Sequence, residues 1–442
     1  MSVWWLYIAL HDVGGMPWLI ALIAIVILAG GLALYYSVAL SIYNLCQERM
    51  HTYGKCLLFA ACWTAAELAR AQWFTGFPWS AVGYAHINGL LSYAAPWVGV
   101  YGIGFLSAMC ACWLYLQLIQ ASNSSAARVQ ILFLIVLLCI PAFRVCSSEF
   151  QTITVNLLQG NISQTTKYNS GRQQSLDWYA AQAMSSDADL TVMPEIAIPY
   201  FKEELPSGYW EKLEEKFKNG NQTLIMGIPT LDKEKGYGNS AVGIGFESEQ
   251  QYDKYHLVPF GEFTPDSLKW FTRLMVNELG DFNRGSLTQE PFIWKNIKLS
   301  LTICYEDLFG EELAARFVKE ELTPSLFVNI SNIAWFGDTM VVNQHLDIAR
   351  MRSLEFERPT VRATNTGGTA VISADGEILK KLAAYTQGNL TTEVNITKKP
   401  GITLYAYWAG HWGLKPLWIL CLSIMAMAIF KQYRFQKLRH RL

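Results

Sequence analysis

The residues of this chain whose types suit covalent chemistry are a cysteine, a lysine and a glutamate far apart in the sequence. Cys304 ends the apolar stretch SLTIC, Lys254 stands between aromatic residues in YDKYHLVPF, and Glu195 lies between two prolines in MPEIAIP. A thiol with a free pKa near ~8.5 is mostly protonated at neutral pH, so a nucleophilic cysteine needs a base and a nearby cation. A desolvated carboxylate can take the thiol proton, and an ammonium can stabilise the thiolate and the oxyanion of a tetrahedral intermediate.

Each of these residues also has a purely structural interpretation. A cysteine at the end of an apolar strand is commonly a core residue. A Pro-Glu pair commonly forms a surface turn, and a lysine between aromatic rings commonly makes a cation–π contact. Taken singly, none of the three residues demonstrates a site.

The composition is that of a membrane protein, because 52% of the residues are hydrophobic and only 16% are charged. Two stretches, 13–47 and 71–127, contain no Asp, Glu, Lys or Arg, and each exceeds the ~20 residues that a helix needs to cross a bilayer. The stretch 1–10 is apolar but shorter, and we expect it either to lie in the membrane interface or to be the end of a further span. The apolar runs predict five spans, at 16–43, 56–76, 88–118, 129–147 and 415–431.

Basic residues near the span ends predict the orientation. Arg49, Lys55 and Arg128 lie in short loops, and the tail KQYRFQKLRHRL contains five Lys or Arg and no acidic residue. Lysine and arginine near span ends favour the cytoplasmic side, so we expect these segments to be cytoplasmic. The large segment 148–414 then faces outward.

Cys304 is the only cysteine in the outward domain. The other eight lie in or beside the predicted spans, at positions 46, 56, 62, 110, 112, 139, 146 and 421. Cys304 therefore has no disulfide partner within its domain, and a lone thiol in an oxidising compartment is a liability unless it is buried or has chemistry to perform. His256, His345 and His411 lie in the same segment, but none stands in a motif typical of Cys-His enzymes.

The outward segment alternates between short β-branched runs and amphipathic stretches, which predicts an α/β domain. Strands are expected at 152–159, 190–195, 223–229, 241–246, 297–304, 325–331, 360–364 and 368–374. Helices are expected at 171–185, 209–218, 308–320 and 343–356.

Polar residues repeatedly follow the ends of these predicted strands. Glu195 follows one strand, Cys304 a second, and the residues 329–332 a third. Sites in open α/β sheets gather at the carboxyl ends of strands, so we expect these positions to converge on one pocket. The sequence contains no Gly-rich phosphate loop, metal-ligand spacing or internal repeat, so we expect side chains alone to do the chemistry, with no metal and no cofactor.

In this order, the stretches PE, YDKYHLVPFGE and ICYED are similar to the Glu-Lys-Cys pattern of the nitrilase, or carbon-nitrogen hydrolase, superfamily. With several spans before this domain and one after it, the chain resembles the apolipoprotein N-acyltransferase family over nearly its whole length. Further matching stretches are GGMPW, AELARAQWFTGFPW, QGNISQ, SNIAWFGDT and QHLDIARMRSLEFERPTVRATNTGGTAVISADG. The resemblance implies an α/β nitrilase-like αββα sandwich at 148–400, between a transmembrane helical domain at 1–147 and a transmembrane helix with a basic tail at 401–442.

The resemblance also implies roles for individual residues. Glu195 would be the general base, Lys254 the stabilising cation and Cys304 the nucleophile. Glu262 in PFGE matches an additional glutamate of the superfamily that supports the lysine.

Other residues match positions beside the nucleophile or are candidates for substrate contact. Tyr305 and Glu306 match the family's residues next to the nucleophile. Tyr168 stands where the family usually has tryptophan, and Ile333 where it has aspartate. Trp335, Phe336 and the loop 260–285 are candidates for a cover over the acyl chain. The candidate substrate-binding residues are Tyr168, Trp335, Phe336, Phe77 and Trp79.

The implied reaction is a two-stage acyl transfer at the outer face of the bacterial inner membrane. Cys304 would take an acyl group from a membrane phospholipid as a thioester, and the free amine of a diacylglyceryl lipoprotein would accept it. Both substrates lie in the lipid bilayer, and no nucleic acid takes part. The aromatic stretch 73–84 would serve either as an interfacial belt or as a contact surface for the acyl chain. Glu67 and Arg70 would form a structural pair, or alternatively contact a lipid headgroup.

Two other functions remain open at this point. A membrane-tethered amidase or nitrilase that hydrolyses small amides would use the same nucleophile with a different acceptor. A transporter or receptor with an inactive domain would retain the spans alone, but the presence of Glu195, Lys254 and Cys304 argues against it.

Overall fold

Two six-stranded β-sheets organise the segment between Phe150 and Thr397 in the computed structural model. The structure describes residues 3–120, 149–218, 221–232, 236–246, 248, 250–264, 281–398 and 401–439. The chain divides into two units, one formed by Met1–Ile25 with Ser147–Gly401 and the other by Val26–Cys146 with Ile402–Leu442. The fourth predicted span, 129–147, lies outside the described residues, as does much of the loop 260–285.

In the first sheet the strand order is β12-β1-β2-β3-β4-β5. The three strands β1, β2 and β3 are parallel, and the others pair antiparallel. The bounds are β1 Phe150–Gln159, β2 Leu190–Val192, β3 Thr223–Asp232, β4 Gly236–Ile244, β5 Gln250–Asp253 and β12 Gly388–Thr397.

The second sheet repeats this plan in the order β11-β10-β9-β8-β7-β6, with β7, β8 and β9 parallel. Its strands are β6 Phe292–Trp294, β7 Ile297–Ile303, β8 Leu326–Ser331, β9 Thr360–Thr364, β10 Ala370–Ile372 and β11 Ile378–Lys381. All eight predicted strands are confirmed, and the four that the sequence did not predict are β5, β6, β11 and β12.

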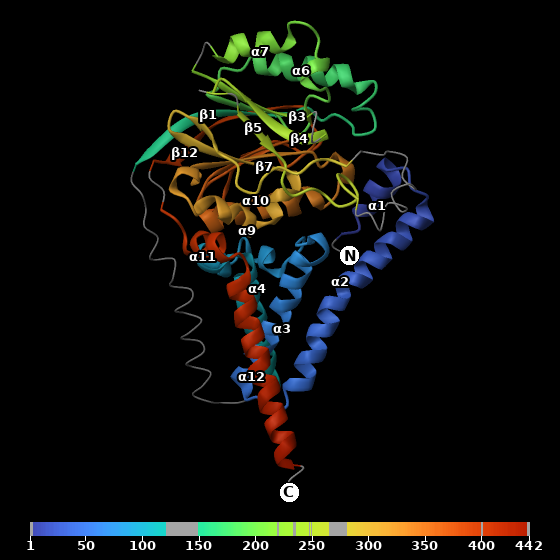
Figure 1. The fold of residues 1–442 in the computed structure, drawn as a ribbon, viewed down its shortest axis with the longest axis vertical. Coiled ribbons are helices and arrows are strands. Elements are labelled where there is room, and N and C mark those ends of the chain that lie inside the picture. The colour runs from blue at the N-terminus through green and yellow to red at the C-terminus, as the bar shows by residue number, and fades with distance from the viewer. Residues whose placement is uncertain are drawn as a thin grey trace. The chain divides into compact units, whose positions relative to one another are not determined.

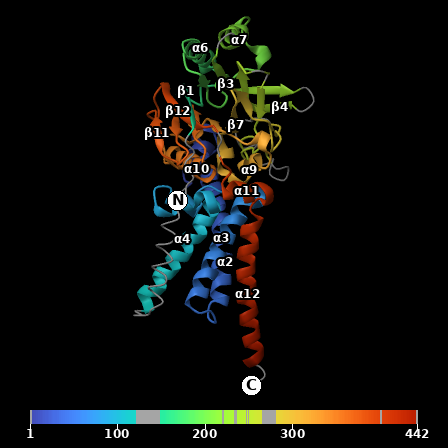
Figure 2. The same cartoon turned by 90° about the vertical axis from the view of Figure 1, so that its left-hand side faces the viewer.

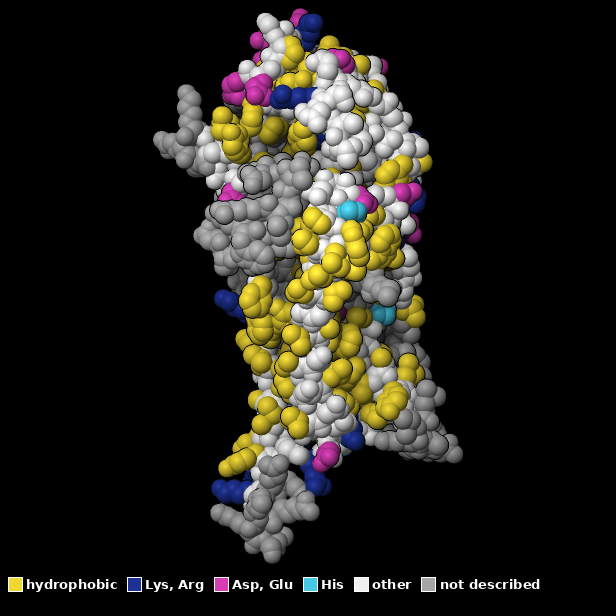
Figure 3. All heavy atoms as spheres, turned by 90° about the vertical axis from the view of Figure 1, so that its right-hand side faces the viewer, with side chains coloured by type: hydrophobic (Ala, Val, Ile, Leu, Met, Phe, Trp, Pro, Cys, Tyr) yellow, Lys and Arg dark blue, Asp and Glu magenta, His cyan; other side chains and the backbone are white. Residues whose placement is uncertain are grey.

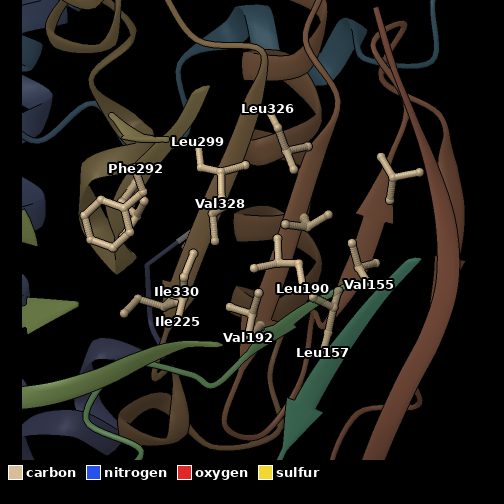
Figure 4. Close-up of a cluster of buried hydrophobic side chains, with 14 of the residues drawn as sticks. Val155, Leu157, Leu190, Val192, Ile225, Phe292, Leu299, Leu326, Val328 and Ile330 are labelled. Carbon is tan, nitrogen blue, oxygen red and sulfur yellow. The ribbon is translucent and has the colours of Figure 1, made fainter. Parts of the chain in front are cut away.

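Alternating apolar residues join the two sheets face to face. On β7 and β8 every second residue, including Leu299, Leu301, Val328 and Ile330, is buried in one cluster with residues of β1, β2 and β3 (Figure 4). Successive side chains of a strand point to opposite faces, so the intervening Ser300, Thr302 and Asn329 belong to the other face of the second sheet. One face of this sheet is thus hydrophobic core, and the other carries a polar network.

Helices cover the outer faces of both sheets (Figures 1 and 2). The helices α6 (Gly171–Met184) and α7 (Tyr209–Lys218) bury Leu176 and Phe217 against the first sheet. The helix α10 (Val341–Phe356) packs Leu346 and Ala349 against β10 of the second. The domain is therefore the αββα sandwich that the resemblance implied.

The helix predicted at 308–320 was wrong as a single element. After β7 the chain forms a 3-10 turn and then leaves the helical region at Phe309, with φ −103° and ψ 78°. The four short pieces are η8 Cys304–Leu308, α9 Gly310–Ala314, η9 Ala315–Phe317 and η10 Glu320–Leu322. The apolar spacing that suggested a helix is real, because Leu313 and Phe317 are buried, but it arises from successive short turns.

Among the described residues, three helical segments are long and apolar enough to cross a membrane: Trp18–Cys46, Leu90–Gln117 and Lys415–Arg434. The second predicted span is a 21-residue helix, Thr52–Gln72, that carries Lys55, Glu67 and Arg70. Figure 3 shows hydrophobic side chains gathered over the helical part of the chain with few charged ones among them. The helices are α2 Trp18–Cys46, α3 Thr52–Gln72, α4 Ala95–Gln120, α11 Leu404–Trp412 and α12 Lys415–Arg439.

Short helical turns complete the described chain. They are α1 Leu6–Ile8, η1 Ala9–Val13, η2 Trp73–Thr75, η3 Val82–His86, η4 Leu90–Ala94, η6 Lys202–Glu204 and η11 Ala334–Phe336.

Leu299→Ala should weaken the sandwich by about 2–5 kcal/mol, because it removes a fully buried side chain between the sheets and leaves a cavity. Leu379→Ala on β11, where the leucine is 54% exposed, is the matched control and should change the free energy of unfolding by less than about 0.5 kcal/mol. Urea unfolding in detergent, followed by circular dichroism, measures both. Equal losses in the two variants would contradict the proposed location of the core.

Candidate active site

Three strand ends bring the predicted residues together. Cys304 directly follows β7, Lys254 directly follows β5, and Glu195 comes three residues after β2. The Lys254 ammonium lies 3.1 Å from a carboxylate oxygen of Glu195 and 2.8 Å from one of Glu262. Lys254 acts electrostatically on the Cys304 thiol as well. Of the strand-end positions that the sequence predicted to converge, the Asn332 main-chain amide donates to Glu195 at 2.8 Å and also acts on the Cys304 thiol.

The turn that carries Glu195 depends on close packing against β3. Ile196 has a positive φ of 46°, which is unusual for a β-branched residue. A Cβ atom on Gly227 of β3 would lie 2.4 Å from the Pro194 carbonyl oxygen and 2.7 Å from the Glu195 Cα. Glycine at position 227 therefore lets the glutamate turn lie directly on the strand.

A shared set of donors surrounds the two carboxylates. The Asn239 side-chain amide donates to Oε1 of both Glu195 and Glu262, at 2.8 and 2.7 Å, and Lys254 donates to the same two oxygens. The remaining oxygens accept main-chain amides, from Asn332 to Glu195 and from Val258 to Glu262, each at 2.8 Å. Both carboxylates are thus fixed in place. Asn239 was not predicted, because nothing in the stretch GNSAV marks it.

These carboxylates determine the charge state of the lysine. Burial alone would lower the pKa of Lys254, but Glu195 and Glu262 outweigh it and hold the pKa well above its ordinary value. The side chain is therefore a permanent cation although it is almost completely buried.

Cys304 begins a 3-10 turn with φ 55°, in the left-handed region that a non-glycine residue seldom adopts. It is a free cysteine and partly exposed, although it also packs against the sheet core. Burial raises the pKa of the thiol to about 12, with Glu195 adding to the effect and Lys254 opposing it. The resting sulfur is consequently a thiol and not a thiolate, so attack requires a base.

Glu306 ties this turn to the loop that carries Lys254. Its carboxylate accepts the main-chain amide of Ile303 at 2.6 Å and that of Tyr255 at 2.7 Å. It also accepts the Tyr252 hydroxyl at 2.9 Å. The predicted support residue therefore fixes nucleophile and cation relative to each other. Its predicted neighbour, Tyr305, is buried and packs edge-on against Phe309.

His345 holds the main chain of Cys304 and has both ring nitrogens engaged. Its Nε2 lies 3.2 Å from the Cys304 carbonyl oxygen, and its Nδ1 lies 2.9 Å from the Arg362 guanidinium. Since Arg362 can only donate, Nδ1 accepts and Nε2–H donates to the carbonyl. Burial and the neighbouring Arg362 hold the pKa of His345 well below its ordinary value, so the ring is neutral. Arg362 in turn pairs with Asp307 at 2.9 Å.

A second buried lysine lies behind the general-base candidate. Lys167 is only 2% exposed and donates to the Glu195 carbonyl oxygen at 3.3 Å. Burial lowers its pKa to about 8, and Glu195 opposes that effect. The neighbouring Tyr168 is 40% exposed, and burial followed by Glu195 raises its pKa to about 12. Tyr168 is therefore close enough to Glu195 for the carboxylate to affect its hydroxyl group. Its role as a substrate contact stays a prediction.

The other predicted contact residues fall into two groups. Trp335 and Phe336 form η11, which begins two residues after Asn332. Phe77 and Trp79 belong to the unit of membrane helices, where Arg70 donates to both of their carbonyl oxygens, the former at 3.0 Å. Contact of any of the four with an acyl chain stays a prediction.

Glu67 and Arg70 both bind the loop that follows α3. While Arg70 donates to Phe77 and Trp79, Glu67 accepts the main-chain amide of Val82 at 2.8 Å. The charged residues within α3 thus hold the aromatic loop in its conformation, each through its own bonds to the main chain, whereas the direct pairing predicted for them stays a prediction.

In the part of the chain that the structure describes, no group of three or more His, Cys, Asp or Glu side chains is arranged to hold a metal ion. The arrangement around Cys304 can support acyl transfer through a thioester, with a carboxylate to move the proton and an ammonium to stabilise the oxyanion.

Residues 154–398 match the carbon-nitrogen hydrolase family, which agrees with the two-sheet fold and makes the sandwich an enzyme domain of that class. Residues 1–113 match the apolipoprotein N-acyltransferase N-terminal domain. An apolipoprotein N-acyltransferase of Verminephrobacter eiseniae is 43% identical over 93% of this chain and 81% of its own length. One of Ralstonia nicotianae is 37% identical over 89% and 76%. The chain belongs to the apolipoprotein N-acyltransferase family.

Alkylation by iodoacetamide should reveal the protonated state of Cys304. Because burial and Glu195 raise the pKa of this thiol to about 12, its reaction rate should still be rising with pH well beyond ~8.5, where a free thiol is half ionised. Mass spectrometry of the peptide around residue 304 gives the rate at each pH, with glutathione in the same sample as the reference thiol. A plateau at or below the pH at which glutathione levels off would contradict the raised pKa.

Proposed function

We propose that this protein transfers a fatty acyl group from a membrane phospholipid to the N-terminal amine of a diacylglyceryl-cysteine lipoprotein. Membership of the apolipoprotein N-acyltransferase family supports this function. The observation that carries it is the buried Lys254 ammonium, which contacts Glu195 and acts on the Cys304 thiol. A base, a cation and a nucleophile at one point are what thioester chemistry needs.

In the first half of the reaction, Glu195 takes the proton of the Cys304 thiol as the sulfur attacks the ester carbonyl of the phospholipid. The resulting oxyanion is stabilised by the Lys254 ammonium. The bond from the acyl carbon to the glycerol oxygen then breaks. The proton held by Glu195 passes to that oxygen, which leaves a thioester and a lysophospholipid.

In the second half, the free amine of the lipoprotein attacks the thioester carbonyl. Glu195 accepts a proton from the attacking nitrogen, and Lys254 again stabilises the oxyanion. The carbon–sulfur bond breaks, and Glu195 returns the proton to the sulfur. The products are an N-acylated lipoprotein and the free thiol, so the enzyme is ready for another cycle.

The location of the reaction is part of the same proposal. Since both substrates are lipids, the active site must lie at a bilayer surface, and the helices long and apolar enough to cross a membrane support this location. The basic residues near the span ends support an inner-membrane protein with its C-terminus in the cytoplasm and its catalytic domain on the periplasmic side. A membrane-tethered amidase remains the second candidate, but no observation favours it.

Incubation of the purified protein with phospholipid should increase the mass of the peptide around Cys304 by one fatty acyl group. The increase should disappear when a diacylglyceryl lipopeptide with a free amine is added. Cys304→Ala should abolish it, and Glu195→Gln should slow thioester formation by about 10²–10⁴, the usual contribution of a general base. Cys421→Ala, which removes a buried cysteine of the membrane unit, is the control. Steady hydrolysis of small amides without acyl-enzyme formation would favour the amidase.

Asn239→Leu tests the shared donor between the carboxylates. The variant removes two hydrogen bonds to charged groups, each contributing about 1.5–3 kcal/mol, so acyl transfer should fall by about 10²–10⁴-fold. The rate of N-acyl lipopeptide formation measures it. Asn395→Leu on the exposed face of β12 is the matched control and should retain the wild-type rate. An unchanged rate in Asn239→Leu would show that the donor is dispensable.

A further inference from the structure

The N-terminal segment, residues 3–13, packs on the catalytic domain beside η11. The Trp5 side chain is only 1% exposed, and its ring meets that of Phe336 edge-on with 4.7 Å between the centroids. Its indole nitrogen donates to the Gln344 side chain at 3.2 Å. The preceding residue, Trp4, is 46% exposed. The two adjacent tryptophans therefore differ sharply in exposure, and Trp5 is the one that anchors the segment to the catalytic domain.

A glycine allows the N-terminal segment to approach. Gly337 follows η11 with φ 61°, a conformation that residues with side chains rarely adopt. A Cβ at this position would lie 3.2 Å from the Ile8 side chain. The contact between the N-terminal segment and the catalytic domain thus includes Ile8 as well as Trp5.

The loop that Trp5 contacts through Phe336, residues 332–340, is attached to the reaction centre on both sides. At its start, the Asn332 amide donates to the Glu195 carboxylate at 2.8 Å. The helix α10 that follows the loop begins with a turn that carries Gln344, and its next residue, His345, lies 3.2 Å from the Cys304 carbonyl oxygen. A displacement of this loop would therefore act on the base and on the nucleophile together.

The middle of the loop has little support of its own. Its regular structure is the three-residue turn η11, and Trp335, Phe336 and Gly337 are only half-buried. Met340, further along, is 44% exposed. Ring packing and a hydrogen bond from Trp5 therefore supply an external support for this loop.

We propose that Trp5 is a positioning residue that keeps the loop 332–340 in place over the thioester, so that the amine and not water resolves the acyl-enzyme. This inference rests on the proposed function. In transfer the amine nitrogen bonds to the acyl carbon, the carbon–sulfur bond breaks, and an amide and a thiol result. In hydrolysis a water oxygen takes the place of the nitrogen and a free fatty acid leaves. A loosened loop admits water, because exclusion of water depends on a closed pocket.

The experiment measures how the acyl-enzyme partitions between the two acceptors. Full-length wild type, Trp5→Ala, Trp5→Phe and Trp4→Ala are loaded with phospholipid and then mixed with a diacylglyceryl lipopeptide. The ratio of N-acyl lipopeptide to free fatty acid should fall at least about 10-fold in Trp5→Ala, since small displacements at a reaction centre have effects of this size. Trp5→Phe, which keeps a ring and loses the indole N–H, should recover part of the ratio, and Trp4→Ala should match wild type.

Loss of stability alone would lower the amount of active protein and leave this ratio unchanged, so the ratio separates positioning from folding. If Trp5→Ala does not load at all, Gln344→Met decides, because it removes the acceptor of the indole N–H and leaves the N-terminal segment intact. A lowered ratio in that variant supports the inference, and a wild-type ratio overturns it. An unchanged ratio in loaded Trp5→Ala likewise overturns it. Absence of any acyl-enzyme in wild type overturns the proposed function itself.

Discussion

The reaction centre depends on one buried ammonium held between two carboxylates. Lys254 contacts Glu195 and Glu262 at once, and each carboxylate has further donors of its own. In the proposed reaction Glu195 carries a proton for part of each cycle, which gives a reason for the second carboxylate. A protonated Glu195 no longer favours a charged lysine, whereas Glu262, which takes no proton in the proposed steps, stays in contact with the ammonium. The negative charge that leaves Glu195 appears on the sulfur and then on the oxyanion, both beside the same cation. Lys254 therefore keeps a negative partner at every step.

The same sandwich geometry explains how the nucleophile is held in an unfavourable backbone conformation. A left-handed residue such as Cys304 costs on the order of 1–3 kcal/mol and persists only where its surroundings fix it. The inner face of the second sheet is hydrophobic core, but its outer face carries Thr302, Asn329 and Arg362. Thr302 and Arg362 both donate to Asp307, and Asn329 donates to the Thr302 hydroxyl. This network reaches the Cys304 carbonyl through His345. A β-strand with one apolar and one polar face therefore supplies both the packing and the hydrogen bonds that support the turn.

The sequence predicted the inner part of this fold better than its edges. All eight predicted strands lie inside a sheet with partners on both sides, whereas the missed strands β5, β6, β11 and β12 are the four sheet edges. Edge strands are short or polar, as QQYD and ILKK show, and lack the apolar runs that mark buried strands. The three reactive residues were predicted because their chemistry limits the choice of side chain. Asn239 and Trp5 were missed because hydrogen bonding by an amide and packing by an indole are common, and the Trp5 partner lies 339 residues away.

On the periplasmic side, where we propose that the catalytic domain lies, the raised pKa of Cys304 protects a lone thiol. Oxidation and disulfide exchange proceed through the thiolate, so a cysteine whose pKa is raised to about 12 resists both while it is idle. The burial that protects the sulfur also makes the sulfur unreactive. In the proposed reaction the adjacent carboxylate restores the reactivity of the sulfur by taking its proton when a substrate carbonyl is in place. A strongly acidic thiol would not need Glu195, but it would react with any oxidant that reached it. The combination of a protonated thiol, a fixed carboxylate and a permanent cation therefore makes nucleophilicity conditional on the bound substrate.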